Sequence, residues 1–327
     1  MKIVIATPFY PPAIGVLATY AAGLEGALKH NGHDVQVIVS RTLPAGLRHI
    51  NHFFRILFSL RSVGLLIALD TWTTGVPAAC ASFLTGTPFA LRIGGDHLWE
   101  TYIARTRSTI RFSDFYPRAD FSLKERLIFR VNTFLIRRAR RVFFNTGFQK
   151  EIWEKAYPLL KGKTVLLENY YPARIETPAP IGRIFVSANR PATYKNEMTL
   201  EKAFARAKER HPDIELATHP LPHDEHLARI ARAYAVIIPS ISEVGSNIAI
   251  EAVVRGRPFI MSEDSGTKER LSECGFFIDT RSEKAFEDGL ESLLDPAVYE
   301  RCASAARNFS FVHSWDDIVK EILSAID

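Results

Sequence analysis

The sequence predicts an α/β protein built from two doubly wound, Rossmann-like domains. Short apolar runs alternate with segments of helical periodicity along the whole chain, which is the pattern of parallel strands joined by crossover helices. A length of 327 residues suggests two domains, at roughly 150 residues per domain. A proline-rich segment, YYPARIETPAPIG at 170–182, has the composition of an extended linker between them.

The first half starts with an apolar strand at 2–7, a loop, a helix at 17–30 and a second strand at 34–39. The segment 52–72 comes closest to a membrane span, but two arginines and a glycine interrupt it, so we interpret it as a helix followed by a buried strand. Strands are expected at 65–69, 89–93 and 142–145.

The second half repeats this architecture after the linker. Its apolar runs predict strands at 184–187, 214–217, 235–238, 258–261 and 276–279, with helices between them. We therefore divide the chain into a first domain at 1–172, a second domain at 173–310 and a terminal helix within 311–327.

The composition excludes several classes of protein. With 47% hydrophobic and 24% charged residues the chain is not disordered, and its three separated cysteines exclude a disulfide framework and a thiolate zinc site. Prolines interrupt the N-terminal apolar run where a signal peptide would continue. These features indicate a cytoplasmic globular protein.

The net charge of +5 is unevenly distributed: residues 1–172 are strongly basic, whereas residues 173–327 are acidic. Much of the basic excess lies on a predicted helix at 123–141. Helical spacing places one group of residues on an apolar side and another on a basic side: Leu127, Ile128, Val131, Phe134 and Leu135, and Arg126, Arg130, Arg137, Arg140 and Arg141. The Arg126–Arg141 helix presents either an ordinary solvated face or a surface for an anionic membrane or a phosphorylated acceptor.

The most informative stretch is 236–269. A buried strand ends at Pro239-Ser240, a loop carries Glu243 and Gly245, and a helix begins near Ser246. Free amides at a helix N-terminus suit a phosphate, while carboxylates beside it suit sugar and ribose hydroxyls. The alternative is a loop carboxylate and a helix carboxylate with structural roles alone.

Glu243 and Glu251 form an E-x7-E motif within PS-x-x-E-x-G-x5-EA-x3-G-x-P. This setting resembles the retaining nucleotide-sugar glycosyltransferases of family 4, which have the GT-B fold. RIGGDHLWE at 92–100 is similar to the G-D-x-x-W-E stretch of a bacterial subset, and NRPATYK at 189–195 matches the R-x4-K pair of the family. The first strand-loop-helix unit at 9–39 also resembles it.

The resemblance implies a GT-B fold with two domains facing a cleft, a shortened second domain and a C-terminal helix that crosses back to the first. Arg190 and Lys195 would neutralise the donor diphosphate. Glu251 would bind the ribose, and Glu243 a hydroxyl of the transferred sugar. The remaining donor contacts would come from a loop glycine and from backbone amides: Gly15, and Gly245, Ser246, Asn247 and Ile248.

Asp96, with His97, would lie beside the anomeric centre, where a carboxylate stabilises developing positive charge. The alternative is that Asp96 caps the helix that follows it, and the two roles are compatible. Since no D-x-D sequence occurs, we expect metal-independent chemistry and no cofactor besides the donor. His219, His223 and His226 have a spacing that allows zinc ligation, but the prolines between them favour loop histidines.

Two departures from the family pattern stand out. Val16 follows Gly15 where paired glycines are frequent, and only 43 residues separate Lys195 from Pro239. They motivate an alternative, a nucleotide-sugar-binding or partner-binding protein that has lost transfer activity. A nucleic-acid-binding function is weaker, because the chain has no recognisable module for it.

The resemblance thus implies a retaining hexosyltransferase of cell-surface polysaccharide synthesis. It would use a nucleotide sugar and a glycan or lipid-linked acceptor, and it would lie in the cytoplasm or peripherally on the inner face of the plasma membrane.

Overall fold

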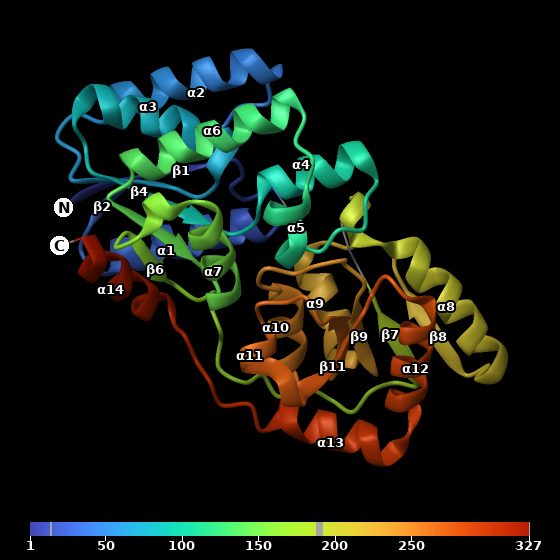
Figure 1. Cartoon of the computed structure of the whole chain (residues 1–327). Helices are drawn as coiled ribbons and strands as arrows, with labels where there is room; N and C mark the ends of the chain where they lie inside the picture. The colour runs from blue at the N-terminus through green and yellow to red at the C-terminus, as the bar shows by residue number, and fades with distance from the viewer. Residues whose placement is uncertain (14, 188–191, 327) are drawn as a thin grey trace. The chain divides into compact units, whose positions relative to one another are not determined.

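The computed structural model describes residues 1–13, 15–187 and 192–326. They form two compact units, and each contains one parallel sheet (Figure 1). The first unit comprises residues 1–98, 120–170 and 313–327, and the second comprises 99–119 and 171–312. The segment 99–119, which lies in the first half of the sequence, therefore groups with the second unit.

The sheet of the first unit has the strand order β2-β1-β3-β4-β5-β6. Its strands are β1 (Lys2–Thr7), β2 (Asp34–Val39), β3 (Leu65–Ala68), β4 (Phe89–Ile93), β5 (Arg141–Phe144) and β6 (Thr164–Leu166). Its helices are α1 (Val16–His30), α2 (Ala45–Ser59), α3 (Val76–Thr85), α6 (Leu123–Arg138), α7 (Gly147–Ala156) and α14 (Trp315–Ile326), with short turns η1 (Thr71–Gly75) and η2 (Pro158–Leu160).

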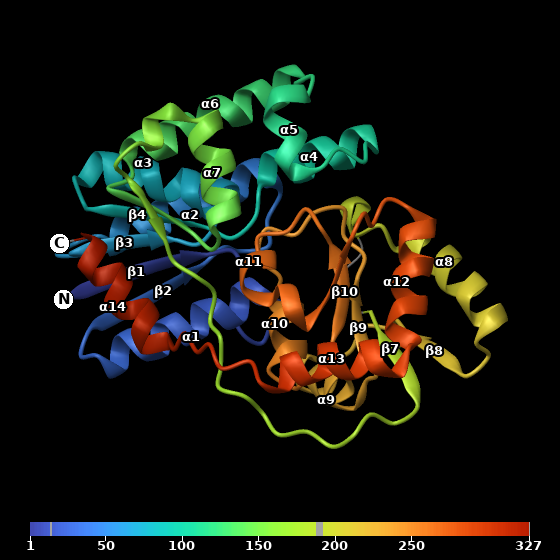
Figure 2. The same ribbon diagram turned by 60° about the horizontal axis from the view of Figure 1, so that its bottom comes forward.

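Apolar runs form these strands because both faces of a parallel sheet are covered. One face carries α2, α3 and α6, and the other carries α1 and α14 (Figure 2). Side chains of β1, α1 and α14 share one hydrophobic core. The predicted return of the C-terminal helix to the first domain is thus confirmed.

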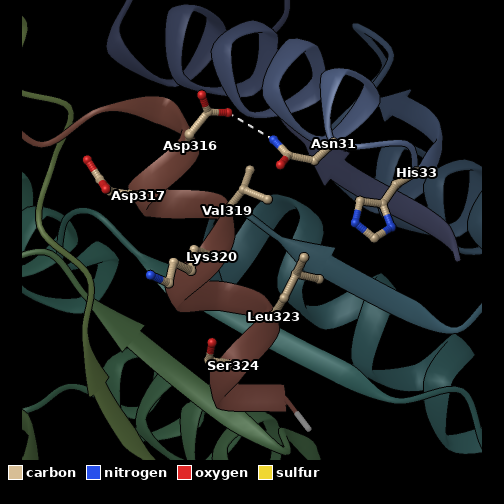
Figure 3. A pocket seen from close by; sticks show the side chains of 8 residues that line it. All are labelled: Asn31, His33, Asp316, Asp317, Val319, Lys320, Leu323 and Ser324. Atoms are coloured by element: carbon tan, nitrogen blue, oxygen red, sulfur yellow. Dashed lines mark hydrogen bonds between the residues drawn. The ribbon is translucent and has the colours of Figure 1, made fainter.

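Helix α14 packs closely on α1 because a glycine lies at the contact. A Cβ atom on Gly23 would come within 2.2 Å of the Trp315 ring. Trp315 also stacks on Tyr170, with ring centroids 4.9 Å apart. In the same turn of α14, Asp316 accepts a hydrogen bond from the side chain of Asn31 over 2.9 Å (Figure 3).

Buried Arg92 organises the place where the chain leaves and re-enters the first unit. Its guanidinium lies 3.6 Å from the centre of the Tyr20 ring and donates to the side-chain oxygen of Asn169 over 2.7 Å. Nδ1 of His313 lies 3.0 Å from the Asn169 carbonyl oxygen. The departing and returning segments are therefore held side by side.

The second unit has the strand order β11-β10-β9-β7-β8. Its strands are β7 (Arg183–Val186), β8 (Ile214–Ala217), β9 (Ala235–Ile238), β10 (Phe259–Ser262) and β11 (Gly275–Ile278). Its helices are α4 (His97–Thr106, from Trp99 onward), α5 (Phe112–Arg118), α8 (Glu197–Arg210), α9 (His223–Arg232), α10 (Asn247–Val253), α11 (Lys268–Leu271), α12 (Glu283–Leu294) and α13 (Pro296–Arg307), with the turns η3 (Thr193–Lys195) and η4 (Ser272–Cys274).

Alternation along the strands of this sheet divides its core into two clusters. Phe185 and Ile237 face α8 and α12, whereas Val186 and Val236 face α9 and α10. This arrangement confirms a second Rossmann-like unit. None of the helices in the described ranges is long and apolar enough to cross a bilayer.

The predicted helix at 123–141 needs a correction. Helix α6 ends at Arg138, and Arg141 already belongs to β5, so Arg140 and Arg141 are not on the helix. Its buried side carries Glu125 and Asn132, while Leu127, which we expected on the apolar side, is exposed. The capping box explains Glu125: its carboxylate accepts from the Ser122 amide, and the Ser122 hydroxyl accepts from the Glu125 amide.

Helix α2 buries a histidine, His52. His52 is fully buried, and neither ring nitrogen has a partner among the described residues. Burial lowers the pKa of His52 to about 4. The native state therefore binds the proton more weakly than the unfolded chain does.

We predict that the free energy of unfolding falls as the pH drops from about 6.5 to about 4, because in this window the unfolded chain binds a proton at position 52 and the native state does not. In His52→Leu, the loss of unfolding free energy over this pH range should be smaller by roughly 2–3 kcal/mol. Urea denaturation across this pH range tests it, with exposed His30→Leu as the control. Equal pH dependence in wild type and His52→Leu would contradict the prediction.

Candidate functional site

Two residues from separate sequence motifs form a partly buried ion pair in the second unit. The Lys195 ammonium donates to Oε1 of Glu243 over 2.7 Å, and the two side chains are only 13% and 14% exposed. Ser240 also donates to this carboxylate oxygen. The lysine of the R-x4-K motif and the first glutamate of the E-x7-E motif therefore meet at one place, although their sequence positions are far apart.

The loop after β9 holds Glu243 through its backbone. The amide of Glu243 donates to the Asp264 carbonyl over 3.1 Å, and its carbonyl accepts from the amide of Gly266 over 3.0 Å. Glu243 and Ser265 thereby form an isolated parallel bridge. Because both backbone groups are engaged, the direction of the Glu243 side chain is determined by the loop after β10.

Lys195 is anchored in a similar way. The amide of Ile241 donates to the Tyr194 carbonyl over 2.9 Å, and the Asn196 side chain donates to the Thr280 carbonyl over 2.5 Å. The Thr280 hydroxyl in turn donates to the Ser240 carbonyl over 2.8 Å. The loops after β7, β9 and β11 are thus tied together around the ion pair.

The segment 99–119 packs on these same loops, which the sequence did not indicate. Arg107 donates to the Thr193 hydroxyl over 2.8 Å, and the Trp99 ring lies 5.3 Å from the Tyr194 ring. The amide of Phe112 donates to the Ser242 hydroxyl over 2.9 Å. Trp99 of the G-D-x-x-W-E stretch therefore contacts the residue that precedes Lys195.

Helix α10 starts where the sequence predicted. Its N-cap is Ser246, whose hydroxyl accepts from the amide of Ala249 over 3.4 Å, and Asn247 is its first residue. The helix is only seven residues long. Gly245, Asn247 and Ile248 thus flank or open a short helix, and their amides belong to the loop-to-helix turn next to Glu243.

Glu251 lies on α10 in an environment that opposes ionisation. Burial raises its pKa to about 7, an effect that nearby Arg255 partly offsets. One carboxylate oxygen lies 3.9 Å from Nε2 of His223. No described residue donates a hydrogen bond to this carboxylate, in contrast with that of Glu243, so it has free acceptor capacity.

The structure corrects the interpretation of the histidines at 219–226. His223 is the first residue of α9, and His226 is buried within the same helix, so only His219 lies in a loop. Burial lowers the pKa of His226. Among the described residues, no group of three or more His, Cys, Asp or Glu side chains is arranged to hold a metal ion.

The first unit contains the other predicted residues. Asp96 is buried and directly precedes α4, which begins at His97. The His97 ring stacks on Trp72, with centroids 5.2 Å apart. Burial lowers the pKa of His97 and so favours the neutral imidazole, whereas the negative charge of Asp70 acts in the opposite direction.

Sequence reasoning missed the neighbours of His97. Asp70 follows β3 and caps the π-helical turn η1, accepting from the Thr74 amide over 2.7 Å. His49 of α2 lies 3.2 Å from the Trp72 carbonyl oxygen. π-Helical turns are rare and frequently occur at functional sites. The signal that could have found Asp70 is a polar residue directly after the predicted strand at 65–69.

Gly15 and Arg190 are the remaining predicted residues, and the structure describes only Gly15. Gly15 precedes α1 with φ 140° and ψ 160°, a conformation that is essentially restricted to glycine. Arg190 lies outside the described residues. The pocket in Figure 3 is lined by the turn after α1 and by α14 and contains none of the predicted residues.

No family model matches the sequence, and no curated protein matches it. Solved structures do match. Sucrose-phosphate synthase from Thermosynechococcus elongatus has a TM-score of 0.72 at 12% identity and covers 99% of this chain and 97% of its own. HepE from Anabaena, solved with UDP and glucose, has a TM-score of 0.71 at 14% identity, and the match covers 99% of this chain and 100% of HepE.

A third match is the lipopolysaccharide outer core galactosyltransferase WaaB, with a TM-score of 0.66 at 13% identity and 99% of each chain covered. The chain has the GT-B fold. The Lys195–Glu243 pair lies at the carboxyl ends of the strands of the second sheet. In open α/β sheets, ligands bind at this end of the strands.

We predict that Lys195→Met destabilises the protein by roughly 1–3 kcal/mol, because it leaves the partly buried Glu243 carboxylate without its cation. The double variant with Glu243→Gln should recover part of this loss. Urea denaturation of the four proteins gives the coupling energy. Strict additivity of the two single effects would show that the pair does not interact in solution.

Proposed function

We propose that the protein is a retaining glycosyltransferase that moves a hexose from a nucleotide diphosphate sugar to a hydroxyl of a glycan or lipid-linked acceptor. The observation that carries the proposal is the pairing of Lys195 with Glu243 on a GT-B fold. It supports a site in which an ammonium for a diphosphate and a carboxylate for sugar hydroxyls are already adjacent.

Each cluster has a distinct role in this proposal. Lys195 and Arg190 neutralise the negative charge that develops on the leaving nucleoside diphosphate as its bond to the anomeric carbon breaks. Glu243 orients a hydroxyl of the transferred sugar, and Glu251 accepts from the ribose. Asp96, with His97, stabilises the positive charge on the sugar ring in the oxocarbenium-like transition state.

The similar structures support the choice of substrates. HepE was solved with UDP-glucose, and WaaB is described as a lipopolysaccharide galactosyltransferase. By analogy, we propose that this chain acts in cell-surface polysaccharide synthesis and lies peripherally at the inner face of the plasma membrane.

Two cations suffice to neutralise the diphosphate, so we propose that turnover needs no metal ion, which EDTA treatment tests. The anomeric configuration of the product, read by NMR, tests retention.

Arg190→Ala and Lys195→Ala should abolish donor binding, and Glu243→Ala should lower turnover by roughly 10²-fold or more without unfolding the protein. Isothermal titration with a panel of nucleotide sugars, followed by assay of nucleoside diphosphate release, measures both steps. Exposed Lys208→Ala and Glu209→Ala on α8 are matched controls. Wild-type turnover in all three site variants would refute the site assignment.

Donor affinity should depend on the ionisation of Glu251. Ribose hydroxyls donate to the charged carboxylate, so donor affinity should be constant above about pH 7 and fall by up to about tenfold for each pH unit below it. Glu251→Gln should bind more weakly and lose this dependence. Titrations between pH 5.5 and 8.5 check the prediction, and an unchanged slope in the variant would assign the ionisation to another group.

The second candidate is a nucleotide-sugar-binding protein without transfer activity. Val16 beside Gly15 and the short interval between Lys195 and Pro239 favour it. Donor binding that Lys195→Ala abolishes, together with no turnover in any acceptor mixture, would support this candidate over the transferase.

A further inference from the structure

Helix α2 directs its apolar stripe outward. Leu47, Ile50, Phe54 and Phe58 recur every three or four residues, so they lie on one side of the helix, and they are 60, 57, 47 and 78% exposed. The opposite side is buried and includes His52, which has no partner for its ring nitrogens among the described residues. An amphipathic helix of a globular domain normally buries its apolar stripe. The outward stripe of α2 is therefore suited to an apolar environment outside the chain.

The neighbouring helices continue this surface. Helix α3 contacts both α2 and α6, and the three lie on the same face of the first sheet (Figures 1 and 2). We call their solvent side the α2–α3–α6 face. Besides the α2 stripe, it exposes Phe83, Leu84, Leu123, Leu127 and Phe134. These three helices carry nine of the nineteen exposed large apolar side chains found among the described residues, which concentrates apolar surface on one face.

The charges on this face all have the same sign. Helices α2 and α3 contain no Asp or Glu, and the only carboxylate of α6, Glu125, is buried in its capping box. Lys124, Arg126, Arg130 and Arg137 of α6 are exposed. Helical spacing puts the three arginines in one row directly beside the row of Leu123, Leu127 and Phe134. Apolar residues that would enter a bilayer are thus next to cations that would reach lipid phosphates.

One depression on α6 combines arginines with aromatic rings. Arg126 and Arg130, one turn apart, line a depression whose other walls are Phe121 and Phe129. Arg130 and Arg137 make no ion pair with any residue that the structure describes. In contrast, exposed Arg206 of α8 lies 2.7 Å from Glu283 of α12. The guanidinium groups of Arg130 and Arg137 are therefore available to an external anion, and Arg126, whose Nε donates to the Phe121 carbonyl, keeps its terminal nitrogens for such an anion.

We propose that the α2–α3–α6 face docks on an anionic phospholipid bilayer, with the α2 stripe in the interfacial region and Arg126 and Arg130 on lipid phosphates. A second copy of the chain is a poor occupant, because two such faces would place arginine rows of like charge against each other. The proposal of docking depends only on the α2–α3–α6 face. The further idea that docking brings the enzyme to a lipid-linked acceptor rests on the proposed function.

The test is co-sedimentation of the full chain with phosphatidylcholine vesicles, with and without phosphatidylglycerol. Wild type should bind only the anionic vesicles, and added salt should weaken binding. Arg126→Gln/Arg130→Gln should weaken binding by about fivefold per charge. Phe54→Ser/Phe58→Ser should weaken it by at least about tenfold, through loss of buried apolar area. Both pairs are exposed, so circular dichroism should show an unchanged fold.

Matched controls come from the other unit. Met198→Ser and Lys208→Gln alter an exposed apolar residue and an exposed cation of α8, and both should bind vesicles as wild type does. Equal binding to neutral and anionic vesicles, insensitivity to both double variants, or a lipid-free dimer that these variants dissociate would overturn the proposal. Donor binding is measured without vesicles in every protein, and its absence in wild type would refute the proposed function while leaving the docking result intact.

Discussion

A parallel sheet must be covered on both faces, and this constraint determines the architecture of the first unit. Every crossover from β2 onward moves in one direction across the sheet. Right-handed connections therefore place α2, α3, α6 and α7 on the same face. Only α1 remains for the other face. Helix α14 fills the space beside α1, and the missing side chain of Gly23 admits Trp315.

The same parallel arrangement explains where polar side chains gather. All strands of a parallel sheet end at one edge, so the residues that follow them meet there. In the first unit this edge collects Asp70 and Asp96, the residues after β3 and β4. In the second it collects the loops that hold Lys195 and Glu243. Apolar strands thus supply rigid supports, and the chemistry lies in the loops that join them to helices.

Much of the fold could be predicted from the sequence, because fully buried strands require apolar runs with clear boundaries. Strands β1, β2 and β4 begin and end where these runs do. Strand β6, in contrast, was missed, since it is a three-residue edge strand with no buried side chain. The buried side of α6 was also predicted incorrectly. Capping by Glu125 and the hydrogen bond that Asn132 donates to Tyr157 put polar residues inside, which periodicity cannot anticipate.

The candidate site, like the fold, was predicted in part from the sequence. The motifs located Glu243, Lys195 and Glu251, because the loop and helix around each have recognisable residue types. The contacts that hold these residues come from distant segments: Thr280 in the loop after β11, and Arg107 and Trp99 in the segment 99–119. His223 near Glu251 belongs to a helix that prolines seemed to preclude. Such contacts depend on tertiary packing and leave no local pattern.

The position of α14 has a consequence for synthesis on the ribosome. One side of the first core is completed by residues 315–326, and His313 meets Asn169 where the chain leaves this unit. A nascent chain that has emerged through residue 170 therefore still exposes the α1 side of its core. Residues 171–312, which include most of the second unit, are translated before that side can close. The first unit in the sequence is thus completed only after most of the second unit has been translated.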